Sequence, residues 1–157
     1  MTGEQLGLAL AALGIVVAIV IAVLQARSKR RGKEDWGDRA AEALGHARAV
    51  LRDCNPLQLV VGFSSTETPK YLEEQITRAN DVESELEVVQ VGHPKKAVRD
   101  EAEKLRDGLR ASMGATAIYV KSIASDHETE SREERAISLH ERAGELADSM
   151  ASALGRE

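Results

Sequence analysis

The stretch VESELEVVQVGHPKKAVRDEAEKL, residues 82–105, places the tripeptide Gly92-His93-Pro94 between two segments whose apolar residues recur every three or four positions. That spacing is typical of one face of an α-helix. Glycine is favoured where a helix ends in the left-handed conformation, and proline is tolerated at the first position of the next helix. The stretch therefore predicts two long helices joined by a tight turn, with Gly92 left-handed.

The same spacing continues on both sides of this turn. Alanine recurs along the apolar faces, which favours helices packed closely at shallow angles. We therefore expect an all-α protein in which about four helices form an antiparallel bundle or coiled coil. The predicted helices span residues 37–54, 69–91, 94–125 and 131–154. The expected core comprises Ala40, Leu44, Ala47, Leu51, Cys54, Leu72, Ile76, Ala79, Val82, Leu86, Val89, Val98, Ala102, Leu105, Leu109, Ser112, Thr116, Tyr119, Ile123, Ala136, Leu139, Ala143, Leu146, Met150 and Ala153.

Two of the predicted helices have capping residues at their starts. Thr68 precedes Pro69, so we expect Thr68 to be the N-cap of the second helix. Ser131 and Glu134 have the spacing of a capping box, which predicts the start of the fourth helix at Ser131.

The segment 56–67, PLQLVVGFSSTE, interrupts the helical periodicity because an apolar run passes abruptly into a polar one. One interpretation is a short helix or extended segment that caps the end of the bundle, with Phe63 in the core. The other is a strand followed by a loop and a helix N-terminus that can hold an anion. If the bundle has a pocket, we expect it here. The residues that mark this pocket or capping segment are Leu57, Val60, Phe63, Ser64 and Ser65.

An uncharged stretch, residues 6–24, precedes the predicted bundle. It contains twelve Leu, Ile or Val residues and seven Gly or Ala residues. As a helix it would be about 28 Å long, close to the thickness of the hydrocarbon core of a bilayer. The stretch predicts a single transmembrane helix, preceded by a short extracytoplasmic tail at residues 1–5.

Charge on either side of this helix predicts its orientation. Residues 1–5 contain no Lys or Arg, and a basic cluster follows the helix within the juxtamembrane linker 25–36. Positive charge is retained on the cytoplasmic side, so we expect the N-terminus outside and the bundle, residues 37–157, in the cytoplasm of a bacterial cell. The cluster is also suited to anionic lipid headgroups. It comprises Arg27, Lys29, Arg30, Arg31 and Lys33.

Residues 34–157 carry 16 basic and 25 acidic side chains, so the predicted bundle has about nine net negative charges. Nucleic-acid binding requires a dense basic face, and the acidic balance argues against it. Small residues line one face of the predicted membrane helix, which predicts a homodimer formed by close helix packing. That face comprises Gly7, Ala11, Gly14, Ala18 and Ala22.

No catalytic signature is found in the chain. Glu42 and His46 are four residues apart and can face the same way, but no second such pair completes a metal site. Cys54 lies on an apolar face, where a thiol packs as a small hydrophobe. Trp36 fits either the membrane interface or a loose linker. We therefore expect no enzyme, no metal and no cofactor.

These patterns predict a single-pass membrane protein whose acidic bundle serves as an interaction or scaffolding module for an unknown protein partner. The alternative is a membrane-tethered sensor that binds a small ligand or metal near residues 57–66. A concave apolar pocket would favour the sensor, and a filled core would favour the scaffold.

Overall fold

The computed structural model describes residues 35–62, 67–123 and 129–155. The predicted membrane helix at residues 6–24, its small-residue face and the basic cluster at residues 27–33 lie outside these ranges. Among the described helices, none combines the length and the apolar character that a bilayer crossing requires. The chain divides into two compact units, and the fold described below is that of the second, Trp36–Glu157.

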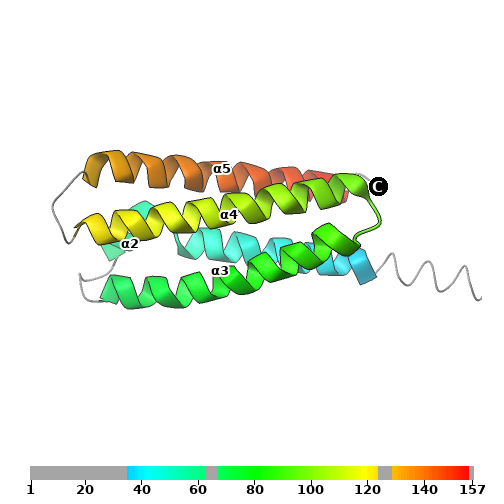
Figure 1. Cartoon of the computed structure of the whole chain (residues 1–157), viewed down its shortest axis with the longest axis horizontal. Helices are drawn as coiled ribbons and strands as arrows, with labels where there is room; N and C mark the ends of the chain where they lie inside the picture. The colour runs from blue at the N-terminus through cyan, green and yellow to red at the C-terminus, as the bar shows by residue number, and fades with distance from the viewer. Residues whose placement is uncertain (1–34, 63–66, 124–128, 156–157) are drawn as a thin grey trace, which may run out of the picture. The chain divides into compact units, whose positions relative to one another are not determined.

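Long antiparallel helices build this unit (Figure 1). All regular elements of the described ranges are helices, which confirms the all-α prediction and the helical bundle. Each long helix reverses the direction of the one before it, as a bundle with short connections requires. The elements are a helix over residues 35–53, then α2 (Pro56–Gly62), α3 (Glu67–Gly92), α4 (Lys96–Ile123) and α5 (Thr129–Gly155).

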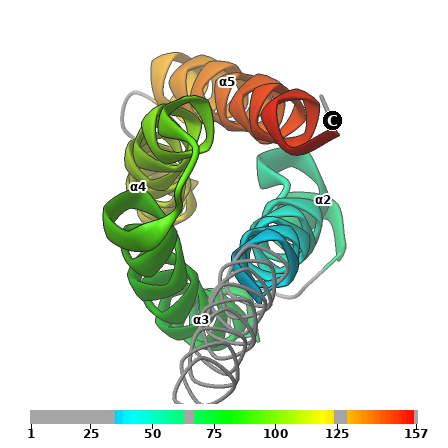
Figure 2. The same cartoon turned by 90° about the vertical axis from the view of Figure 1, so that its right-hand side faces the viewer.

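Seen along their axes, the long helices surround a common core (Figure 2). Helix α4 packs against α3 on one side and α5 on the other. The 35–53 helix closes the ring. His46 on this helix lies 2.8 Å from Glu85 on α3, and Arg48 lies 2.7 Å from Asp148 on α5. These pairs are exposed and contribute little free energy, so the buried apolar side chains hold the ring together.

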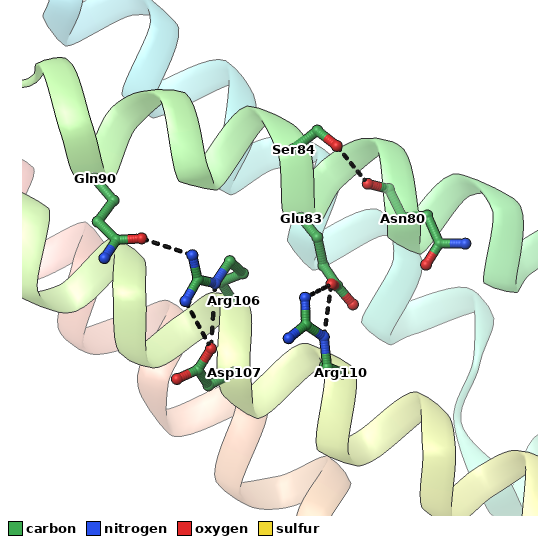
Figure 3. Close-up of polar contacts among 7 residues, drawn as sticks. All are labelled: Asn80, Glu83, Ser84, Gln90, Arg106, Asp107 and Arg110. Atoms are coloured by element: carbon green, nitrogen blue, oxygen red, sulfur yellow. Dashed lines mark hydrogen bonds and ion pairs between the residues drawn. The ribbon is translucent and has the colours of Figure 1, made fainter.

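Polar side chains of α3 and α4 point toward one another between the two helices (Figure 3). The Arg110 guanidinium donates two hydrogen bonds to one carboxylate oxygen of Glu83, at 2.5 and 2.9 Å. Arg106 donates to the side-chain oxygen of Gln90 at 2.7 Å. Both contacts join residues at least sixteen positions apart, so they help to set the register between the two helices.

The predicted core positions are buried or half-buried, with one exception. Ile123 at the end of α4 is 41% exposed, so its assignment to the core was wrong. The periodicity also missed Leu59 on α2, which is fully buried at the end of the bundle. Gly108 lies where α4 and α5 approach closely, because a Cβ built on it would lie 2.7 Å from Cδ1 of Leu146 and 3.9 Å from Cβ of Ala143.

Three predicted helix starts were displaced. Helix α3 begins at Glu67, so Thr68 is a buried residue of its first turn and not the N-cap. Helix α4 begins at Lys96, two residues after the expected Pro94. Helix α5 begins at Thr129, which places Ser131 inside its first turn and excludes the predicted capping box.

Gly92 is the last residue of α3, and its backbone is not in the left-handed conformation. That prediction was wrong, and packing explains the glycine. A Cβ on Gly92 would lie 2.0 Å from Cη2 of Trp36, so only a residue without a side chain leaves room for the indole ring. Trp36 is half-buried against the end of α3.

Candidate binding pocket

Helix α2 is positioned by local capping. The backbone N–H of Leu57 donates a 3.1 Å hydrogen bond to the side-chain oxygen of Asn55, and Pro56 occupies the first helical position. Asparagine at the N-cap followed by proline is a favoured helix start. The prediction of a strand was therefore wrong for Pro56–Gly62. The interpretation of these residues as a short helix was correct.

A cavity of about 450 Å³ lies between α2, the start of α3 and the end of α4. Its walls are mainly apolar and come from all three helices. The residues that line the cavity are Val60, Thr68, Pro69, Leu72, Glu73, Ile76, Ala117, Val120, Lys121 and Ile123.

Two charged side chains of opposite sign lie among these residues. Glu73 on α3 and Lys121 on α4 are both exposed, whereas Thr68 is buried. An apolar cavity with a few polar groups is the usual composition of a site that binds an apolar group and orients its polar part. The lining contains no cysteine, no histidine and no pair of carboxylates.

Exposed apolar residues extend the apolar character of α2 beyond the cavity. Leu57 is 47% exposed and Val61 is 88% exposed, and their spacing of four residues places them on one face of the helix. Exposed apolar side chains that cluster on one element often mark a binding surface. We refer to the cavity together with Leu57 and Val61 as the α2 end of the bundle.

The structure places the residues predicted to mark a pocket in different positions. Val60 lines the cavity, and Leu57 lies on the exposed face of α2. Phe63, Ser64 and Ser65 lie outside the described residues. The sequence located the α2 side of the cavity but missed its walls on α3 and α4. Ile76 and Val120 follow the helical periodicity of core residues, so no sequence signal separates them from the core.

Cys54 follows the 35–53 helix directly and is buried, as its position on the apolar face predicts. Burial, together with the neighbouring Asp53 carboxylate, raises the pKa of the thiol to about 12. A thiol in this state is neutral at physiological pH and is a poor nucleophile. The carboxyl of Asp53 itself has a lowered pKa, mainly through its hydrogen bond with Arg52 and also through Arg78.

The histidines of the described ranges, His46, His93 and His140, do not form a common metal site. The imidazole of His46 contacts Glu85 on α3, and that of His93 is buried at the turn between α3 and α4. The predicted Glu42–His46 pair lies on an exposed helix face. In the ranges that the structure describes, no group of three or more His, Cys, Asp or Glu side chains is arranged to hold a metal ion.

A second hollow of about 500 Å³ lies between α4 and α5 and is lined by Arg110, Arg132 and Arg135 together with small apolar residues. The guanidinium of Arg110 is already bonded to Glu83. Its lining is less apolar than that of the α2 end, which is why we regard the α2 end as the better candidate for binding.

Comparisons of the chain with protein-family models, with curated proteins and with solved structures find no match. The function proposed below therefore rests on the chain's own chemistry.

Proposed function

We propose that this protein is a single-pass, membrane-anchored helical bundle that acts as a non-enzymatic binding module and receives an apolar group of a protein partner at the α2 end. The observation that carries the proposal is the exposed apolar pair Leu57 and Val61 on α2, the helix that also lines the apolar cavity through Val60. A bundle that served only as a spacer would gain stability by filling this volume.

Membrane anchoring is supported by the uncharged stretch at residues 6–24 and by the basic residues that follow it. The same pattern supports an N-terminus outside the cell and a cytoplasmic bundle. Self-association through the face that contains Gly7, Gly14 and Ala18 is part of the proposal, because small residues allow two membrane helices to approach closely.

A small-molecule sensor is the second candidate function, and the size of the cavity favours it. Ligand pockets usually measure about 300 to 1,000 Å³, and the cavity at the α2 end falls in this range. Lys121 can pair with an anionic head group while the walls accept the apolar part. The two candidates share one site and differ in the nature of the occupant.

A photo-crosslinking residue placed at Ile123 tests both candidates in the full chain. Ile123 lines the cavity and is exposed, so benzoylphenylalanine there can reach an occupant. The matched control is Ile118 on the same helix, which is 55% exposed and lines the other hollow. Cells that carry each variant are irradiated, and the purified chain is analysed by gel electrophoresis and intact mass.

A protein adduct at position 123 that is absent at position 118 supports the interaction module. A small added mass at position 123 alone supports the sensor. Replacing Ala117 with Phe fills the cavity and should abolish either adduct, whereas Ala111→Phe on the exposed surface of α4 should not. Equal adducts at both positions, or none, would contradict binding at the α2 end.

A further inference from the structure

The turn that joins α3 to α4 lies at the end of the bundle opposite to α2 (Figure 1), and hydrogen bonds hold its backbone. His93 is only 4% exposed, and its Nδ1 accepts a 3.1 Å hydrogen bond from the backbone N–H of Lys95. The guanidinium of Arg99 donates a 3.0 Å hydrogen bond to the carbonyl oxygen of His93. These hydrogen bonds fix the backbone of the turn, which carries the exposed side chains described below.

Trp36, the first residue of the unit, packs on this same turn. Its indole fills the space beside Gly92 and meets the His93 ring edge-on, with the ring centroids 6.5 Å apart. The guanidinium of Arg39 lies over the indole at 5.4 Å. The chain thus joins the bundle against the α3–α4 turn, and the position of Trp36 relative to this turn is fixed by packing.

Apolar side chains at this end are exposed to solvent. Val91 in the last turn of α3 is 78% exposed and Val88, three residues earlier, is 50% exposed. Pro94 at the tip of the turn is also exposed. Nothing in the described part of the bundle covers these side chains, although apolar groups of this size gain free energy when they leave water.

Positive charge accompanies the exposed apolar residues. Residues 36–40 and 91–100 together carry four basic and two acidic side chains, in a domain that is strongly acidic elsewhere. Lys96 forms a 3.5 Å ion pair with Asp100, but its side chain is 80% exposed, so its ammonium group can also reach another anion. Exposed valines beside lysines are suited to the surface of an anionic bilayer, where negatively charged headgroups cover an apolar interior.

We propose that the α3–α4 turn, through Val91 and Lys96, rests on the anionic surface of the membrane that carries the chain. This inference depends on the membrane anchoring proposed above. The juxtamembrane linker, residues 25–36, ends at the packed indole, and even fully extended its twelve residues reach about 40 Å. A tether of this length keeps the turn within reach of the headgroups, and Lys96 complements their charge.

The test uses the full chain reconstituted in phosphatidylcholine vesicles with or without phosphatidylglycerol. Val91→Cys is labelled with nitrobenzoxadiazole, and Val61→Cys at the opposite end, also highly exposed, is the control. The native Cys54 is 1% exposed and should not react. Fluorescence is quenched by lipids that carry a nitroxide at the headgroup, and alkaline extraction of the vesicles reports membrane anchoring separately.

Stronger quenching at position 91 than at position 61, dependent on phosphatidylglycerol, is the expected result. The charge reversal Lys96→Glu should weaken it, since loss of this lysine alone lowers the equilibrium constant for lipid contact by about fivefold. Equal quenching at both positions, or quenching at position 91 that ignores the charge reversal, overturns the lipid contact. A blue-shifted label at position 91 that lipid does not quench indicates a protein on this surface and also overturns it. If alkaline washing releases the chain, the proposed anchoring fails, and the lipid contact fails with it.

Discussion

The imidazole of His140 on α5 has a buried Nδ1 that accepts no hydrogen bond from the described part of the chain. Burial lowers the pKa of this histidine from its usual 6.5, and the adjacent Glu141 only partly opposes the shift. The folded protein therefore favours the neutral imidazole. Protonation would place a charge in a site that supplies no partner, which destabilises the fold.

Because the pKa of His140 is lowered by folding, the unfolded chain binds the proton first as the pH falls. Stability should be constant above the unfolded pKa and should decline below it, by at most about 1.4 kcal/mol per pH unit for one group. The variant His140→Leu should lack this decline, so its advantage over the wild type should grow between about pH 7 and pH 5. Urea denaturation followed by circular dichroism measures the difference. If the free energies of unfolding of the two proteins change in parallel with pH, His140 does not cause the decline.

At the scale of a helix, the two glycines in the middle of α4 have different surroundings. A Cβ on Gly114 would have no neighbour within 4 Å, whereas one on Gly108 would lie 2.7 Å from Cδ1 of Leu146 on α5. Glycine weakens a helix interior through its conformational freedom, at a cost of about 1 kcal/mol relative to alanine. Only Gly114 can be replaced by alanine to recover this free energy without disturbing α5.

Gly114→Ala should therefore stabilise the bundle by about 0.5 to 1 kcal/mol. Gly108→Ala is the matched control and should gain less or lose stability, because the Leu146 side chain must move away. Thermal unfolding of the two variants under identical conditions makes the comparison. An equal gain at both positions would mean that α4 and α5 do not approach closely at Gly108.

The long helices could be predicted from the sequence because their apolar residues recur with helical spacing over many turns. Helix ends could not, since the capping signal at Thr68 has an equally good alternative two residues earlier in the sequence, at Thr66. Gly92 shows why local rules fail at such positions. Its glycine is required by Trp36, which is 56 positions away in the chain, and no pattern in either segment indicates this contact.

The candidate binding pocket was predictable only in part for the same reason. The break in periodicity at residues 56–62 drew attention to α2, and Asn55-Pro56 contains a start signal for a short helix. The cavity itself depends on how α2, α3 and α4 are arranged, because all three helices line it. Ile123 has the spacing of a core residue, but it is 41% exposed and lines the cavity.

At the scale of the whole unit, the two ends of the bundle have different chemistry. Trp36 and the α3–α4 turn lie at one end, and the apolar cavity lies at the other (Figure 1). Helix α4 connects them with 28 residues, which is about 42 Å at 1.5 Å per residue. A chain tethered through Trp36 would therefore hold its binding pocket away from the bilayer, where a partner in the aqueous compartment can reach it.

Which compartment contains the bundle depends on the charges around residues 6–24. The five basic residues between Arg27 and Lys33 have no counterpart in residues 1–5, so the bundle should be cytoplasmic. Green fluorescent protein fused after Glu157 should be fluorescent, and alkaline phosphatase at the same position should be inactive.

The matched control for this orientation moves the charge across the membrane helix. Replacing the five basic residues with Gln, together with Thr2→Lys, Glu4→Lys and Gln5→Lys, should reverse or mix the two reporter signals, because lysine near the N-terminus then opposes its export. An active phosphatase in the unaltered chain would place the α2 end outside the cell. Reporter signals that ignore the transferred charge would show that another feature of the chain sets its orientation.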